Sequence, residues 1–318
     1  ELGYKSAKLF DDGIVPGAGH LIHMPSHIYI NTGDYHKGSL ANIHAIEEDS
    51  NYITSCRAQG AYPLAYYPHN YHFLAATATL EGNSEWAIKA SLEMSSYVNE
   101  QIMQEPGWGT LQHYYSIPYY VYVKFGKWDE ILLMENFDSS LKYPEAIRHY
   151  ARGLAFLGKN DLVSARKEAR KLSDYAKDKS LQEISIWEIN SVWTLVQIAD
   201  KVLHGEILAA EGNYSESIYL LKEAIEIEDA LNYNEPPDWF FSVRHHLGAI
   251  QIEAGEYNDA IITYKEDLAN FPKNGWALNG LAIAYAQDGD ENMANLSKQD
   301  FDNVWSTADI ELNSSRIK

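Results

Sequence analysis

Cysteine is almost absent from this chain, which holds one, Cys56, in 318 residues. A lone cysteine cannot form an internal disulfide, so cysteine usage leaves a reducing and an oxidising compartment equally open. No catalytic partner for Cys56 stands out in the sequence. We therefore expect Cys56 to be a small buried side chain with no chemical role.

Basic residues and long apolar runs are also scarce. Lys and Arg number 25 against 45 Asp and Glu, and the formal net charge is -20. Such a charge repels nucleic acid and anionic lipid, so neither is an expected partner. No apolar run approaches the roughly 20 residues of a membrane span, which predicts a soluble protein. The sequence also lacks a phosphate-binding glycine loop, a Gly-x-Ser-x-Gly elbow and a dinucleotide fingerprint, which excludes those enzyme classes.

What the sequence does contain is a repeat. A helical stretch, a turn glycine and a second amphipathic stretch recur, and the turn glycines are Gly33, Gly82, Gly126, Gly158, Gly212, Gly255 and Gly289. The last two lie 34 residues apart, and that is the period of tetratricopeptide repeats, each a pair of antiparallel helices. Apolar residues recur at i, i+3, i+4 and i+7. The pattern predicts an all-α fold, a right-handed tetratricopeptide-like superhelical solenoid of about seven helical hairpins.

We expect this solenoid to be a single domain over residues 1–318. It would hold histidine-rich N-terminal repeats (1–125), degenerate central repeats (126–235) and C-terminal repeats (236–318). The segment from Ser180 to Glu211 predicts one long helix or two joined helices, with Trp187 and Trp193 in the core. The pair Pro236-Pro237 predicts a loop, because neither proline continues a helix.

Five segments carry a family resemblance. They are Gly-His-Leu-Ile-His23-Met-Pro-Ser-His27-Ile-Tyr, Tyr62-Pro-Leu-Ala-Tyr66-Tyr-Pro-His69-Asn, Phe125-Gly-Lys-Trp128-Asp-Glu, Glu235-Pro-Pro-Asp-Trp239 and Asn274-Gly-Trp276-Ala-Leu. Together they resemble a largely uncharacterised family of bacterial tetratricopeptide-repeat proteins, over nearly the whole chain. The resemblance implies a protein of the bacterial cytoplasm or periplasm. It also implies that positions 2, 5, 9 and 12 of each first helix line a concave groove, and it implies no particular reaction.

Histidines take those groove positions in three consecutive repeats. Counting each turn glycine as position 15, the histidines fall at positions 2, 5 or 9, and they are His20, His23, His27, His69, His72 and His113. Neighbouring helices pack roughly 8–10 Å apart, so imidazoles from adjacent repeats should converge. In His23-Met-Pro-Ser-His27 one helix offers two ligands at i and i+4. Pro25 between them should kink or unwind that helix.

Gathered imidazoles favour a Zn, Cu, Fe or Ni ion. The first-choice ligands are His23, His27, His69 and His72, and the second choices are His20 and His113. Two alternatives stay open. The histidines could donate hydrogen bonds to a polar or anionic ligand, or they could merely complete the core.

Other candidates surround the histidines. Tyr66 and Tyr67 precede the second cluster and are candidate catalytic residues that could orient a ligand or act as an acid. Candidate ligand-binding residues in later repeats are Arg148, Arg152, Trp239, Arg244, His245, Trp276 and Asn279. Groove-facing arginine in an acidic protein suggests a negatively charged ligand, and salt bridges between repeats are the alternative.

These observations support two functional hypotheses. In the leading one the protein holds a transition metal in its groove, and this metal could make it a metalloenzyme for a small polar or anionic substrate, through metal-activated water or oxygen. In the alternative, the chain is a non-catalytic module whose groove takes a peptide or a small anion.

Overall fold

The computed structural model describes residues 3–11, 13, 17–57, 60, 62–99, 101–134 and 140–318. Within these ranges the fold is helical apart from one hairpin of two short strands, β1 (Ser185–Ile186) and β2 (Asn190–Ser191). The prediction of an all-α protein is confirmed. Among the described residues no helix is long and apolar enough to cross a membrane.

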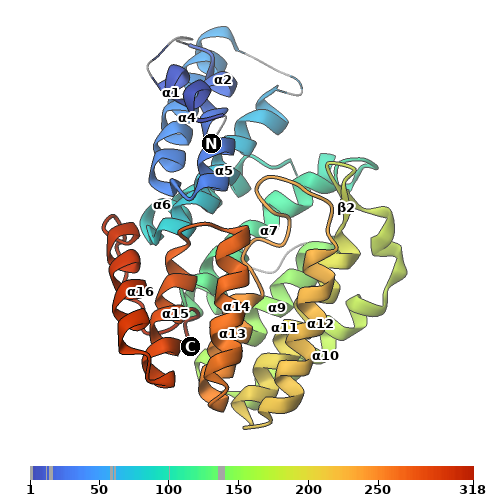
Figure 1. Cartoon of the computed structure of the whole chain (residues 1–318). Helices are drawn as coiled ribbons and strands as arrows, with labels where there is room; N and C mark the ends of the chain where they lie inside the picture. Colours follow the sequence, from blue (N-terminus) through green and yellow to red (C-terminus); the bar gives the residue numbers. More distant parts are fainter. Residues whose placement is uncertain are drawn as a thin grey trace.

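The N-terminal part, blue to green in Figure 1, holds the histidine clusters. Its helices are α1 (Tyr4–Asp11), α2 (Gly19–His23), α3 (Pro25–Thr32), α4 (Tyr35–Cys56), α5 (Tyr67–Glu81), α6 (Ser84–Ser96), α7 (Gly109–Lys124) and α8 (Trp128–Leu133), with a π-helical turn at Tyr62–Tyr66 and a 3-10 turn at Ile102–Gln104. Pro25 breaks the first helix into α2 and α3, as predicted, because it has no N–H to donate and begins a new helix.

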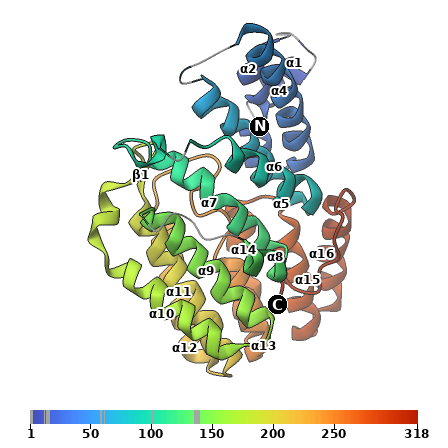
Figure 2. The same ribbon diagram turned by 180° about the vertical axis from the view of Figure 1, so that it is seen from behind.

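The remaining helices follow as antiparallel pairs. They are α9 (Lys142–Gly158), α10 (Leu162–Lys177), α11 (Val192–Ala210), α12 (Tyr214–Asp229), α13 (Arg244–Ala254), α14 (Tyr257–Asn270), α15 (Gly275–Asp288) and α16 (Glu291–Val304), with a 3-10 turn at Lys179–Glu183. Neighbouring helices pack in sequence order, as in a helical solenoid, and Figure 2 shows α9 to α13 side by side from behind. The right-handed superhelix and the number of repeats stay predictions.

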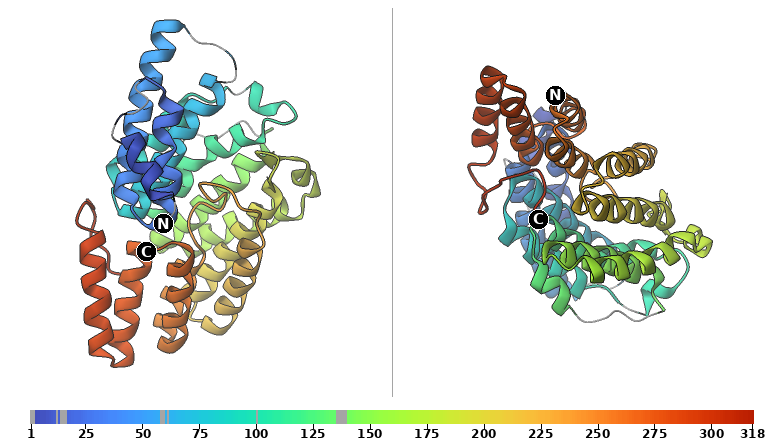
Figure 3. Two further views of the ribbon diagram at one scale, coloured as in Figure 1. Left: turned by 45° about the horizontal axis from the view of Figure 1, so that its top comes forward. Right: turned by 90° about the horizontal axis from the view of Figure 1, so that it is seen from below.

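The solenoid closes on itself, which the repeat pattern did not indicate. Trp276 on α15 donates its indole N–H to the carbonyl of Thr79 on α5 at 2.8 Å, and Tyr35 on α4 donates to the carbonyl of Pro272 at 2.8 Å. Seen from below, the helices run around an arc that brings α15 and α16 back beside the N-terminal helices (Figure 3). The first and last hairpins therefore share one core.

This closure gives Gly33 a role beyond its turn. Gly33 ends α3 at φ 73°, and a Cβ there would lie 2.1 Å from the carbonyl oxygen of Pro272. Gly289 ends α15 at φ 88°, with nothing within 4 Å of such a Cβ. Both replacements by Ala carry the strain of a left-handed residue, but only Gly33→Ala also forces the closing contact apart.

We therefore expect Gly33→Ala to lower the free energy of unfolding by about 1–3 kcal/mol more than Gly289→Ala does. Chemical denaturation of the two variants and the wild type measures the difference. Equal losses would show that the contact at Pro272 contributes nothing to stability.

Three sequence interpretations are wrong. The segment Ser180 to Glu211 is not helical throughout, because a 3-10 turn and the β1–β2 hairpin precede α11. Trp187, expected in the core, lies at the hairpin turn and is 38% exposed, whereas Trp193 packs against the core. Cys56 is exposed rather than buried, because it ends α4 at the surface.

A long loop, residues 230–243, joins α12 to α13 and crosses the helices that carry the histidines. Figure 1 shows it in orange beside α7. Phe240 stacks on His72 of α5 with ring centroids 5.2 Å apart, and Trp239 packs edge-on against Tyr120 of α7 at 5.4 Å. Pro236 and Pro237 lie in this loop, as predicted. The loop thus delivers its side chains to the histidine-bearing face.

Candidate metal centre

Three histidines converge on one point. His23 ends α2, His27 lies on α3 and His69 lies on α5, and each offers a nitrogen within 4.8 Å of the others. Their rings rest on one buried phenyl ring, Phe73, whose centroid lies 4.6, 4.4 and 5.0 Å from those of His23, His27 and His69. Phe73 is fully buried, so the cluster has a fixed apolar floor.

The hydrogen bonds of His23 define which nitrogen is free. Nδ1 donates to Oδ1 of Asn42 at 2.7 Å, and the amide of Asn42 is oriented by donating from Nδ2 to the carbonyl of Gly38 at 2.7 Å. The hydroxyl of Ser26 also lies 3.1 Å from Nδ1 and donates its own proton to the carbonyl of His23. The proton of His23 is therefore on Nδ1, and Nε2 carries a lone pair.

The loop supplies the corresponding partner for His27. Nδ1 of His27 donates to Oε2 of Glu235. The other carboxylate oxygen, Oε1, accepts hydrogen bonds from Tyr233 and Asn31. Burial opposes ionisation of Glu235, but these donors outweigh it and hold its pKa below the usual range. Glu235 is thus a carboxylate, and its bond to Nδ1 leaves Nε2 as the nitrogen of His27 that is directed toward His23.

With both Nδ1 atoms donating outward, the remaining nitrogens of the two rings face each other. The Nε2 atoms of His23 and His27 lie 3.0 Å apart. Burial, together with the neighbouring His69 and His27, lowers the pKa of His23 well below 6.5. Burial, then the charges of His72, His27 and His20, lowers the pKa of His69 in the same way. At neutral pH His23 and His69 are therefore in the neutral form that binds a metal.

The other predicted ligands lie apart from this point. His20 stands beside the cluster, its ring 5.7 Å from that of His23 and edge-on to Tyr66 at 5.0 Å. His72 and His113 form a separate, fully buried pair with ring centroids 5.4 Å apart. Among the residues that the structure describes, neither ring nitrogen of His72 has a hydrogen-bond partner, and His113 bonds only to Tyr143, at 2.8 Å. The six histidines thus divide into a three-ligand cluster, a flanking ring and a buried pair.

The two candidate catalytic tyrosines point to different places. Tyr66 is 43% exposed and lines a cavity of about 440 Å³ together with His20, His27 and His69. Tyr67 is buried, and its hydroxyl lies 3.2 Å from that of Tyr71. Only Tyr66 therefore borders the space above the histidine cluster.

The predicted ligand-binding arginines have acidic partners. Arg148 forms two hydrogen bonds to Glu145, at 2.9 and 2.8 Å, and Arg244 forms two to Asp229, at 2.9 and 2.7 Å. Arg152 lies 3.8 Å from Glu168, and its Nη1 donates to the carbonyl of Leu132 at 3.3 Å. The alternative interpretation expected salt bridges between repeats, and only Arg244 on α13 pairs with the preceding hairpin; Arg148 pairs within α9, and Arg152 faces Glu168 on α10 of its own hairpin.

The remaining candidates are buried among the packed helices. Trp239 and Trp276 are 3% and 0% exposed, and Asn279 is 5% exposed. His245 contacts Lys124 at 2.8 Å and Asp267 at 3.2 Å. The structure does not bring these residues to the histidine cluster.

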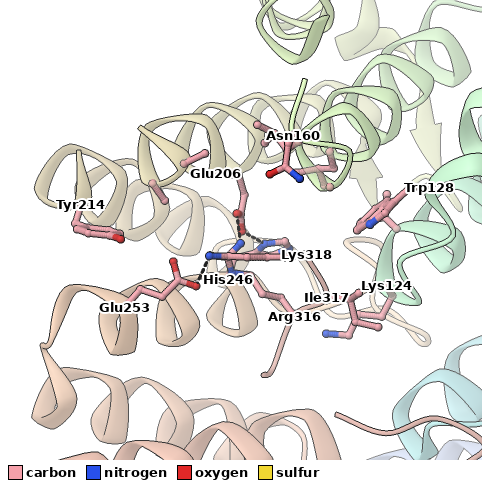
Figure 4. A pocket seen from close by; sticks show the side chains of 16 residues that line it. Lys124, Trp128, Asn160, Glu206, Tyr214, His246, Glu253, Arg316, Ile317 and Lys318 are labelled. Atoms are coloured by element: carbon pink, nitrogen blue, oxygen red, sulfur yellow. Dashed lines mark hydrogen bonds and ion pairs between the residues drawn. The ribbon is translucent and has the colours of Figure 1, made fainter. Parts of the chain in front are cut away.

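A second cavity, also of about 440 Å³, lies between α7, α9, α11, α13 and residues 316–318 (Figure 4). Its charged groups neutralise one another. Arg316 pairs with Glu206 and, at 3.0 Å, with Glu253, while His246 lies 2.5 Å from Glu206. Ser315 accepts from Lys124 at 3.0 Å through its carbonyl. These pairs fasten residues 315–318 to the inner helices, which is a structural role.

Sequence reasoning missed five residues that line the main cavity: Trp187, Ile189, Tyr233, Asn234 and Glu235. The motif Glu-Pro-Pro-Asp-Trp marked the segment of Glu235 but not its destination, which lies 208 positions from His27. The alternation of Ile184, Ile186 and a polar residue between them could have indicated a strand near Trp187.

No family model matches this chain, and no curated protein matches it. The argument for function therefore rests on the site.

Proposed function

We propose that this chain is a tetratricopeptide-like solenoid that binds one transition-metal ion, Zn, Cu, Fe or Ni, through His23, His27 and His69. The observation that carries the proposal is the approach of two Nε2 atoms to 3.0 Å, on rings whose Nδ1 atoms already donate to Asn42 and Glu235. Such a pair repels unless a cation lies between the atoms. A tetrahedral ion with metal–nitrogen bonds of about 2.0–2.1 Å holds two nitrogens about 3.3 Å apart, close to this spacing.

The partners of the ligands support the proposal. Metal-bound histidines usually donate their second N–H to a carboxylate or a carbonyl, which fixes the tautomer and the ring. Glu235 does this for His27, and Asn42 does it for His23. The carboxylate also offsets part of the charge that an ion would introduce.

The arrangement favours an enzyme over a structural metal site. Structural zinc is held by four protein ligands, whereas catalytic zinc has three and keeps a position for water or substrate. The cluster has three histidines, and two of them, His27 and His69, border the 440 Å³ cavity. We propose that a bound ion would polarise water or a small substrate there, with Tyr66 placed to orient it or to donate a proton.

The alternative function, a non-catalytic module whose groove takes a peptide or a small anion, has less support. The 230–243 loop lies across the face where a peptide would bind, through Phe240 and Trp239. The arginines expected to attract an anion already hold carboxylates.

Metal content tests the proposal against its closest rival, a proton shared by His23 and His27. We expect the protein, purified without a histidine tag and reconstituted with Zn²⁺, to retain about one equivalent after dialysis, measured by elemental mass spectrometry. Less than about a tenth of an equivalent of Zn, Cu, Fe or Ni after reconstitution would favour the proton and refute the metal site.

A further inference from the structure

The wall of the cavity above the histidine cluster is aromatic. Beyond the histidines, the apolar part of its lining consists of Tyr66, Trp187, Ile189 and Tyr233, which are 43%, 38%, 37% and 75% exposed. These four side chains come from three separate segments: the turn before α5, the β1–β2 hairpin and the 230–243 loop. Exposed apolar groups gathered around a concavity are typical of a ligand site.

The hairpin holds its tryptophan at a conformational cost. Trp187 and Glu188 have φ of 52° and 59°, in the left-handed region that Gly and Asn usually take, and they lie in the three-residue loop between the paired Ile186 and Asn190. The backbone N–H of Trp187 donates to the hydroxyl of Thr110 on α7 at 2.8 Å, and its ring lies edge-on to His69 at 6.1 Å. A bulky residue in such a turn is unfavourable, and here it places an indole at the cavity.

Charge at the cavity is limited to one carboxylate. Among the described residues that line it there is no Lys or Arg, and the only formal charge belongs to Glu235. Glu235 is already bonded to His27, Tyr233 and Asn31. Asn234 is also engaged, since its Nδ2 donates to Asp238 at 2.7 Å. An anion would find no cationic side chain in this wall, and an organic cation would meet the repulsion of a bound metal ion.

We propose that this cavity binds an uncharged aromatic molecule, held by Tyr66, Trp187 and Tyr233 with one edge toward the histidine cluster. The inference deepens the proposed function and rests on it for any reaction at the metal. Binding itself requires only the aromatic wall, because aromatic rings attract one another in stacked or edge-on geometry without an ion. The volume of about 440 Å³ is within the range of small-ligand pockets.

Three probes of nearly equal size and different charge test the proposal: naphthol, naphthoate and naphthylmethylammonium. We expect the metal-free protein to bind naphthol at least about tenfold more tightly than naphthoate, which Glu235 repels, and the Zn²⁺-loaded protein to bind naphthol more tightly than naphthylmethylammonium, which the ion repels; calorimetry at neutral pH measures both. Trp187→Ala should weaken naphthol binding by about five- to tenfold. Tyr219→Ala should not change it, since Tyr219 is 62% exposed on α12.

Equal or tighter binding of naphthoate by the metal-free protein, or of naphthylmethylammonium by the Zn²⁺-loaded protein, would overturn the proposal. So would an unchanged naphthol affinity in Trp187→Ala. The His23→Ala variant separates this inference from the metal site, because His23 is a proposed ligand that does not line the cavity. It should lose Zn²⁺ and still bind naphthol, whereas retention of Zn²⁺ by that variant would refute the metal site and leave the naphthol result standing.

Discussion

Replacing His27 with Ala should abolish tight Zn²⁺ binding while leaving the helical content unchanged. His27 provides one of three converging nitrogens and is the only one of them bonded to Glu235 among the described contacts. Loss of an outer partner of a metal ligand costs about 10–100-fold in affinity, so loss of the ligand itself should cost more than about 100-fold. Competition with a chromogenic chelator measures the affinity, and circular dichroism measures the helicity.

His36→Ala is the matched control for this variant. His36 also holds a glutamate, Glu81, at 2.7 Å through Nδ1, but it lies on α4 outside the cluster. Its replacement should leave Zn²⁺ affinity unchanged. Glu235→Gln keeps the shape of the partner and removes its charge, so we expect an intermediate loss of about 10–100-fold. Wild-type affinity in His27→Ala, or unfolding of that variant, would contradict the metal site.

His72→Ala tests how far the site extends. The repeat register placed His72 among the first-choice ligands, but its ring packs against His113 and Phe240. We expect this variant to lose stability, because a buried ring is removed from the core, and to retain Zn²⁺. A loss of Zn²⁺ as large as that of His27→Ala would return His72 to the ligand set.

The parts of the site that the sequence predicted depend on short-range geometry. Helical spacing puts residues three and four positions apart on one face, and the repeat sets neighbouring hairpins side by side. These two rules were enough to bring His23 and His27 together with His69. A third local rule predicted the helix break at Pro25: proline lacks a backbone N–H whatever its surroundings.

The parts that the sequence did not predict depend on contacts between distant segments. The path of the 230–243 loop follows from packing against α5 and α7, so nothing near Glu235 in sequence indicates that it bonds to His27. Placing a residue on one face of a helix also does not indicate which neighbouring groups its side chain already pairs with. For Arg148 a signal was present, because Glu145 lies three positions earlier on the same helix and such neighbours pair.

The buried histidine pair leads to a prediction about acid stability. His113 is fully buried, and burial lowers its pKa from 6.5 to about 3. The groups that face it are His72 on α5, Tyr120 on its own helix, and Tyr143 on α9. The unfolded chain takes up a proton below about pH 6.5, while the native state keeps His113 neutral. Its contribution is therefore fully present above that pH and is lost as the pH falls toward about 3.

We expect His113→Gln to be less stable than the wild type near neutral pH, because it loses the packing and the bond to Tyr143. Glutamine does not titrate, so this gap in the free energy of unfolding should shrink by a few kcal/mol between about pH 7 and pH 4. Asp238, whose pKa burial raises to about 6, contributes the opposite slope, but equally in both proteins. Urea denaturation across this range measures the gap. The exposed His44 provides the control, since His44→Gln should run parallel to the wild type. If the difference in the free energy of unfolding between the wild type and His113→Gln stays constant with pH, His113 takes up its proton equally in the native and unfolded states.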